Sequence, residues 1–579
     1  MTLDMSRLGE EFGVLAGASL KELLIAGRNQ DLCQGDVFLI LSTRGKRPRL
    51  FFFRAHDFEN RLRYIADTLD VASTLLLEES YVVDINPNKV LLVEGRLLGY
   101  VEFNEEEECW EFFPPRRIPD HFAKVYRLPR GTADAIVRDA LKSQLDGEIL
   151  VGNFLAGDSE LDVPVSIPAS RLSMHVGIYG MTGSGKSNLM LVLLLSLLNN
   201  NREALRDPSR LRVSAFCIDP HDEFLLGTDK YGIRDIVQSM DRETKKALVG
   251  NFCYLTPHIE GMARGLRSLG RQIRILWSEI QPHDLYSIMS FSPQQIAFID
   301  NVYNKEGENW ISAILSMEEP KVVHRETLYA VKRRLHFLTT SSIFCKDGDS
   351  VLPDVFVALE QGRVLIVNTS LLSDTEQFLL TTVVARTMFD LRKSLKSSVS
   401  FDQFEKLASK RLPPTFYNTI RSIAKSFYVR NGVMRDPRDM PVILVTVEEA
   451  PSILNPEMMK GQSIFKDISR QGRKFNLGLV VVSQQVSVLD NAILSQMNTQ
   501  INLRLGSDRE IRACIENASG NLSGAESEFR IMARGEAILT ASYRDISVPI
   551  RIPKFDDQFL RDRERYKTET TKKPERHRI

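Results

Sequence analysis

The segment Gly180–Ser187 constrains this chain more than any other, because it reads G-M-T-G-S-G-K-S and matches the pattern G-x-x-x-x-G-K-[ST] in full. A short apolar run, 175–179, precedes it, and a longer apolar run, 188–198, follows it. The order strand, glycine-rich loop and helix is the context that this pattern requires, since loop N–H groups and the helix N-terminus then surround a phosphate. The sequence therefore predicts a binding site for a nucleoside triphosphate.

The residues of this loop differ in the chemistry that each can supply. Lys186 can reach the β- and γ-phosphates, and the Ser187 hydroxyl can ligate Mg²⁺. ATP and Mg²⁺ are therefore the predicted cofactors. The other predicted phosphate-binding residues are Gly180, Thr182, Gly183, Ser184, Gly185 and Asn188.

Length and composition indicate a multidomain globular protein. A chain of 579 residues is expected to form roughly three or four domains. Cationic and anionic side chains balance at 75 each, so net charge neither indicates nor excludes a nucleic-acid partner. The six cysteines are scattered without a C-x-x-C pair, which favours a reduced, cytoplasmic protein. The apolar run Leu189–Leu198 is too short to cross a bilayer, so no membrane association is predicted.

Periodicity along the chain predicts an α/β fold with additional domains. Residues 1–165 contain short β-branched and aromatic runs separated by turn residues, which predicts a small β-barrel or a β-sandwich. Alternating strands and helices predict an ATPase core in two parts, 166–256 and 351–558. Helical periodicity predicts a helical insertion at 257–350, and the segment 559–579 is expected to be a basic, mobile C-terminal tail.

Two acidic residues follow the predicted strand 211–218, the first strand after the phosphate loop. Asp219 stands at the strand end, and Glu223 follows four residues later. Carboxylates at a strand tip beside a phosphate loop lie where an open α/β sheet places its chemistry. The alternative for Asp219 is a capping role in the turn that leads to the next helix.

A second acidic pair follows the apolar strand 441–447. In a phosphate-loop ATPase the first acid at such a tip holds Mg²⁺ through water, and the second polarises the attacking water. We therefore assign Glu448 to Mg²⁺ and Glu449 to catalysis.

The last predicted core strand, 477–482, has polar or charged residues at both ends. Gln484 follows it and can sense the γ-phosphate, whereas Arg470, Arg473 and Lys474 precede it. If this cationic cluster faces outward, it serves its own site poorly but can reach the site of a neighbouring subunit. That is the arginine-finger arrangement, which stabilises charge built up in phosphoryl transfer. Plain surface charge is the alternative for Arg473.

The order of these motifs resembles that of the HerA family of hexameric DNA-translocating ATPases, which belongs to the same superfamily as FtsK. The resemblance covers nearly the whole chain, because the N-terminal β-rich segment also looks like the small barrel of that family. The matching motifs are the phosphate loop, D-P-H-D-E-F at 219–224, E-E-A at 448–450, G-R-K at 472–474, S-Q-Q at 483–485 and L-S-Q-M-N-T-Q-I-N-L-R-L at 494–505.

The resemblance implies a RecA-like P-loop NTPase core with an N-terminal small β-barrel and a helical insertion. It also implies a homohexamer with sites at subunit interfaces, double-stranded DNA in a central channel, and a nuclease or defence effector docked on the barrel. The roles that it implies are phosphate and Mg²⁺ binding for Lys186 and Ser187, support for Asp219 and Glu223, catalysis for Glu449, sensing for Gln484, and a trans-acting finger for Arg473 or, alternatively, Arg470.

Two positions depart from the family pattern. Asp222 stands where a small residue is usual, and Pro451 replaces a frequent histidine beside Glu449. The proline removes a hydrogen-bonding side chain next to the water-activating acid, so turnover is expected to be slow or partner-dependent.

Two other functions remain open at this point. Relatives of the family also serve as ATPase scaffolds of antiviral defence complexes with a sirtuin-like or nuclease effector, in which DNA translocation is secondary. A conjugation or secretion ATPase is the weaker alternative, because the sequence contains no transmembrane segment.

Overall fold

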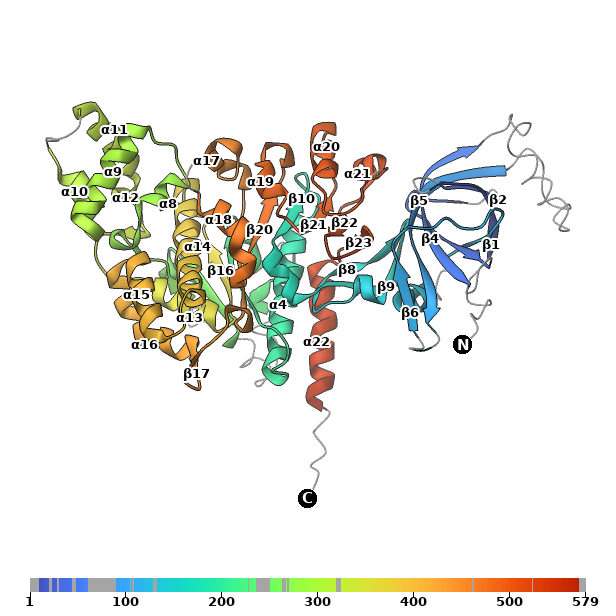
Figure 1. Cartoon of the computed structure of the whole chain (residues 1–579), viewed down its shortest axis with the longest axis horizontal. Helices are drawn as coiled ribbons and strands as arrows, with labels where there is room; N and C mark the ends of the chain where they lie inside the picture. Colours follow the sequence, from blue (N-terminus) through green and yellow to red (C-terminus); the bar gives the residue numbers. More distant parts are fainter. Residues whose placement is uncertain are drawn as a thin grey trace, which may run out of the picture. The chain divides into compact units, whose positions relative to one another are not determined.

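The computed structural model forms two compact units (Figure 1). The first comprises Met1–Ile167, Gly180–Gly185 and Asn498–Pro553, and the second comprises Pro168–Tyr179, Lys186–Met497 and Lys554–Ile579. The structure describes residues 10–19, 23–28, 31–43, 48–60, 90–104, 106, 109–128, 133–227, 229–235, 250–262, 267, 270–318, 324–460, 463–522 and 524–571.

The N-terminal part of the first unit is a closed barrel, as the sequence predicts. Its strand order is β2-β1-β7-β3-β4-β5, and a pairing between β2 and β5 closes the ring, while β6 extends the sheet beyond β5. Register shifts in the long strand β4 mark bulges, which let a strand bend around a barrel. The strands are β1 (Glu11–Ala18), β2 (Leu23–Arg28), β3 (Val37–Ser42), β4 (Arg49–Asn60), β5 (Val90–Asn104), β6 (Cys109–Phe113) and β7 (Lys124–Arg127).

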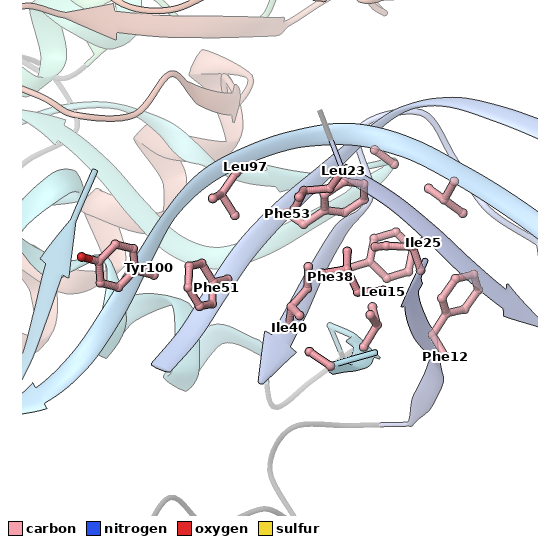
Figure 2. Close-up of a cluster of buried hydrophobic side chains, with 14 of the residues drawn as sticks. Phe12, Leu15, Leu23, Ile25, Phe38, Ile40, Phe51, Phe53, Leu97 and Tyr100 are labelled. Atoms are coloured by element: carbon pink, nitrogen blue, oxygen red, sulfur yellow. The ribbon is translucent and has the colours of Figure 1, made fainter. Parts of the chain in front are cut away.

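Aromatic and aliphatic side chains fill the barrel, as Figure 2 shows. Alternate residues point inward, so Phe38 and Ile40 of β3 lie beside their partners Phe53 and Phe51 on the neighbouring strand β4 and point into the core with them. The ring centroids of Phe12 and Phe38 are 4.9 Å apart. The barrel therefore has a hydrophobic core of its own.

The first unit also contains an antiparallel sheet, in which neighbouring strands follow the order β21-β22-β23-β8-β9. Its strands are β8 (Ile149–Ala156), β9 (Ser159–Ile167), β21 (Thr499–Leu503), β22 (Glu536–Ala541) and β23 (Val548–Arg551). The helices of this unit are α2 (Ala133–Ala140), α3 (Lys142–Leu145), α20 (Asp508–Glu516) and α21 (Glu526–Ile531).

The second unit is built on a parallel sheet with the strand order β13-β12-β16-β11-β19-β20-β10. Its central strands β11, β16, β19 and β20 are buried along their whole length and mostly apolar, as expected of strands covered on both faces. The α/β core predicted from the sequence is confirmed. The strands are β10 (Val176–Tyr179), β11 (Val213–Asp219), β12 (Phe252–Thr256), β13 (Gly270–Gln272), β16 (Val364–Asn368), β19 (Val442–Val447) and β20 (Leu477–Ser483).

Helices make up most of the rest of this unit. The long helix α4 (Lys186–Arg206) follows the phosphate loop, and α14 (Asp374–Lys396) is also buried along most of its length. The other core helices are α5 (Glu223–Leu226), α13 (Leu352–Glu360), α15 (Phe401–Arg411), α16 (Pro414–Tyr428), α17 (Pro456–Lys460), α18 (Ile464–Gln471) and α19 (Asn491–Leu494). The short pairs β14 (Ile275–Leu276) with β15 (Phe344–Cys345) and β17 (Val429–Arg430) with β18 (Val433–Met434) complete it.

The predicted insertion is mainly helical, but the core sheet extends into it, because β13 pairs with β12. Its two tryptophans pack within the protein: the indole N–H of Trp310 donates to the Ile280 carbonyl (2.9 Å) and that of Trp277 to the Phe344 carbonyl (3.2 Å). The helices are α8 (Pro282–Tyr286), α9 (Pro293–Glu306), α10 (Trp310–Ser316), α11 (Arg325–Leu335) and α12 (Phe337–Thr340).

The C-terminal segment differs from the mobile tail expected from the sequence. Helix α22 (Phe555–Thr571) includes most of it, and Phe559 is fully buried. The carboxylate of Asp562 accepts a hydrogen bond of 2.7 Å from Asn199 of α4. These contacts hold a helix whose sequence has little apolar periodicity. Within the described residues, no helix is both long and apolar enough to span a membrane.

Candidate active site

The phosphate loop has the backbone conformation that its glycines allow. Gly183 and Gly185 have φ angles of +78° and +111°, in the region that favours glycine. A Cβ on Gly180 would lie 2.6 Å from the Ser184 hydroxyl oxygen and 2.9 Å from Leu503 Cβ. Gly183 has open space around it, so a phosphate can approach the backbone there.

Helix α4 begins at Lys186, directly after this loop, and its first turn carries Ser187 and Asn188. A helix of 21 residues places a partial positive charge at this end. The side-chain oxygen of Asn188 accepts a hydrogen bond of 2.9 Å from the Phe555 N–H, so α22 is attached to the same turn. The conformation of the loop and the start of the helix are therefore suited to binding the phosphates of a nucleoside triphosphate.

Strand register brings the predicted catalytic residues to one edge of the parallel sheet. Tyr179 at the end of β10 pairs with Ser483 of β20, and Val447 at the end of β19 pairs with Val481. The residues that follow these strands, Glu448–Glu449 and Gln484, consequently lie at the same C-terminal edge, as predicted.

Lys186 and the carboxylates at this edge affect one another electrostatically. Burial raises the pKa of Glu448 to about 8, and Glu449 raises it further, whereas Lys186 opposes the shift. Asp219 and Glu223 also raise the pKa of Glu448. Burial lowers the pKa of Lys186, and both glutamates oppose that shift. A carboxylate at this position offers oxygen atoms, the ligands that Mg²⁺ prefers.

Glu449 has a left-handed backbone with φ of +47°, and its side chain is exposed. Such a conformation is costly for a residue with a Cβ and is concentrated at functional sites. Pro451 lies in the short 3-10 helix Ala450–Ser452, near its start, where the lack of an N–H is tolerated. The proline therefore fits the fold without a hydrogen bond to Glu449.

Asp219 acts as a cap, the alternative that the sequence left open. Its two carboxylate oxygens accept hydrogen bonds of 2.9 Å from the N–H groups of Glu223 and Phe224, at the start of α5. Burial raises the pKa of Asp219 to about 6, and these two bonds oppose the shift. Asp219 thus positions Glu223, and direct contact between either residue and a nucleotide stays a prediction.

A polar network beside this cap was missed by the sequence reasoning. The Tyr254 hydroxyl donates to Asp222 Oδ1 (2.9 Å) and accepts from the Asn368 side-chain amide (2.9 Å). Asp222 has φ of +56°. Asn368 and Tyr254 lie on the neighbouring strands β16 and β12, and the available signal was Asn368 at the end of the apolar run of β16. The network gives the unusual Asp222 a partner.

Arg470 and Arg473 lie at the other edge of the sheet. They precede β20, so the length of this strand separates them from Gln484. Seven residues at about 3.3 Å each span roughly 20 Å. Both side chains are exposed, and within the described part of the chain neither is ion-paired. Neither side chain is long enough to span this distance to the C-terminal edge of the sheet in the same chain.

These features define the class of the protein: a P-loop ATPase with a RecA-like core. The family model for the helicase HerA central domain matches residues 149–388. A probable helicase of Methanocaldococcus jannaschii is 31% identical, with 82% of this chain and 81% of the relative covered. The DNA double-strand break repair helicase HerA of Pyrococcus furiosus is 24% identical, with 83% and 80% covered.

Among solved structures, the plasmid coupling protein TrwB bound to a GTP analogue covers 67% of this chain and 88% of its own, with 12% identity and a TM-score of 0.39. The sequence comparisons settle the family. The chain belongs to the HerA family.

Proposed function

We propose that the protein is an ATP-driven translocase or helicase on double-stranded DNA, working as a homohexameric ring with sites at subunit interfaces. The assembly into a ring is supported by the positions of the proposed catalytic residues. The phosphate-binding and water-activating residues lie at one edge of the parallel sheet, and the proposed arginine finger lies at the opposite edge. Lys186 and Glu449 lie at the C-terminal edge, whereas Arg473 lies at the N-terminal edge. A site completed by Arg473 then needs a second subunit.

In this assignment Ser187 and Glu448 would hold Mg²⁺, which would neutralise charge at the phosphates. Lys186 binds the β- and γ-phosphates, and Glu449 orients and deprotonates the attacking water. Gln484 lies at the same edge and senses the γ-phosphate. Arg473 of the neighbouring subunit stabilises the charge that develops as the phosphoryl group leaves, with Arg470 as the alternative.

DNA as the substrate is supported by the relatives, which are named as DNA repair helicases. One helix also offers a suitable surface: the outward face of α11 carries cations and an aromatic ring at helical spacing. Its opposite face is buried through Leu328, Val331 and Leu335. The cations and the ring of this outward α11 face are Arg325, Tyr329, Lys332 and Arg333, and His336 follows directly after the helix. Tyr329 is 59% exposed.

The partner in this proposal is a nuclease or defence effector docked on the N-terminal barrel. The barrel supports that role because it closes on itself around its own core, so its outer surface is available to another protein.

The experiment measures ATP hydrolysis by the purified chain with and without linear duplex DNA, using Glu449→Gln as the control, together with the mass of the assembly. DNA-stimulated hydrolysis by a hexamer supports the proposal. ATP hydrolysis that DNA does not stimulate, or that requires a co-purifying protein, would favour the alternative of an ATPase scaffold in a defence complex.

A further inference from the structure

Two backbone hydrogen bonds attach the phosphate loop to a distant part of the first unit. The N–H of Met181 donates to the Arg504 carbonyl (2.9 Å), and the N–H of Gly535 donates to the Ser184 carbonyl (3.0 Å). Both ends of the loop are therefore held by residues more than three hundred positions away in sequence. Phosphate binding requires the N–H groups of the loop to point toward the phosphate. The two hydrogen bonds from outside the loop help to hold it in one conformation.

Gly535 is suited to this contact because of its backbone. Its φ of +85° favours glycine, and its N–H lies 3.4 Å from where a Cβ on Gly185 would stand. The turn before it is fixed by Glu536, whose carboxylate accepts from the Ala533 N–H (2.8 Å) and from Arg551 (2.6 Å). A rigid turn thus presents the donor to the loop.

The two attachment points are connected through helix α21. The Leu505 N–H donates to the Phe529 carbonyl (3.4 Å), so the strand end at Arg504 and the helix lie together. We name residues 504–505 and 526–536 the brace. Ile531, within the brace, is an exposed hydrophobic residue, whereas Phe529 is fully buried.

The brace is in turn attached to the barrel. Arg54 of β4, almost completely buried, forms an ion pair with Glu528. Gln34 donates to the Ser527 hydroxyl (2.6 Å). Desolvation by burial is the largest cause that lowers the pKa of Arg96 to about 10, and the nearby Arg54 lowers it further. An ion pair among buried guanidinium groups is sensitive to the loss of one partner, since the other charge is then uncompensated.

We propose that the brace positions the phosphate loop and that the Arg54–Glu528 ion pair makes nucleotide affinity depend on the state of the barrel. Gly535 and Glu528 are positioning residues in this proposal, because neither touches the nucleotide. A partner seated on the barrel would act on ATP binding through these contacts. The inference rests on the nucleotide site of the proposed function, but it needs neither the ring nor DNA.

The test measures binding of a fluorescent ATP analogue with Mg²⁺ to the full chain, with thermal unfolding as the folding control. Gly535→Ala should weaken binding by about tenfold, because a Cβ at this φ strains the turn. Glu528→Gln should weaken it by about fivefold, in the range of a typical coupling between sites. Glu516→Gln is the matched control, since this exposed carboxylate lies in α20, outside the brace, and should leave affinity unchanged.

A charge swap separates the ion pair from general damage. Arg54→Glu combined with Glu528→Arg should recover most of the affinity lost in either single variant. Folded Gly535→Ala or Glu528→Gln chains that bind like the wild type would overturn the proposal, as would a folded swap that recovers nothing. Lys186→Ala tests the site itself: if it still binds nucleotide, the proposed function fails independently of the brace.

Discussion

His175 Nε2 donates a hydrogen bond to the Ser469 carbonyl, 3.0 Å away, and so joins the start of β10 to the helix that carries Arg470. The other ring nitrogen accepts from the Leu479 N–H at 3.0 Å, which fixes the neutral tautomer. His175 is buried and has φ of +67°. One side chain thus sets the geometry between the strand before the phosphate loop and the cationic cluster.

Acid should destabilise the protein through this histidine. Burial lowers the pKa of His175 to about 4, below the ordinary value near 6.5. The unfolded state then binds the proton first, so this stability is present above pH 6.5 and is lost as pH falls toward 4. A shift of this size corresponds to roughly 3 kcal/mol. Urea unfolding of wild type and His175→Asn across this range should show a flatter profile for the variant, and parallel profiles would contradict the assignment.

Nucleotide binding and hydrolysis should separate between two variants. Lys186→Ala should abolish binding of ATP, because it removes the cation that contacts the phosphates. Glu449→Gln should keep binding and lower turnover by about 100-fold or more, since general-base catalysis is lost. Binding by equilibrium fluorescence and turnover by phosphate release measure the two effects. If the Glu449→Gln variant remained active, the general base would have to be another residue, and Glu223 would be tested first.

Arg473→Ala should bind ATP and hydrolyse it about 1,000-fold more slowly, the range of an arginine finger. Mixing it with Lys186→Ala subunits should restore part of the activity, because each variant supplies what its neighbour lacks. Lys474→Ala, an exposed cation in the same turn, is the control. The same mixing with Arg470→Ala decides between the two arginines. Mixed assemblies without any recovered activity would refute a trans role.

The buried pair Arg392–Glu360 should be essential for stability. Its two bonds measure 2.8 and 2.9 Å, and Arg392 also donates to the Phe475 carbonyl (3.1 Å) beside Arg473. Glu360→Gln leaves a buried guanidinium without its charge partner, which should lower the free energy of unfolding by about 3–5 kcal/mol. Urea denaturation measures the loss. Glu405→Gln, on a partly exposed pair with Arg421, should change it by less than about 1 kcal/mol.

Reversing charge on the outward α11 face should weaken binding to duplex DNA. Lys332→Glu with Arg333→Glu removes two phosphate contacts and adds repulsion, so affinity should fall by more than tenfold and the salt dependence should become shallower. Basal ATP hydrolysis without DNA should stay unchanged. Lys142→Glu with Lys554→Glu, two exposed lysines elsewhere, provides a matched charge control. Equal DNA binding by both double variants would place the DNA elsewhere.

Local sequence patterns were sufficient for the phosphate loop and for the type of fold. Gly183 and Gly185 indicate a backbone conformation that few other residues adopt. Apolar runs such as 442–447 indicate strands that are buried on both faces of a sheet. The acids after β19 could be placed at the active edge for the same reason. Parallel strands end at a common edge, so position along a strand predicts position in space.

The sequence by itself determined the nucleotide-binding motif and the strand and helix content of an α/β core with a β-rich N-terminal part, because these depend on residues close together in the chain. Tertiary structure alone decided the capping role of Asp219, the Tyr254–Asp222 contact, the helix at 555–571 and the attachment of the phosphate loop to Gly535. The last three depend on contacts between segments far apart in sequence, whereas the Asp219 cap joins residues only four and five positions apart. A side chain such as Asp219 can either bind a ligand or cap a helix, and only its neighbours in space decide which.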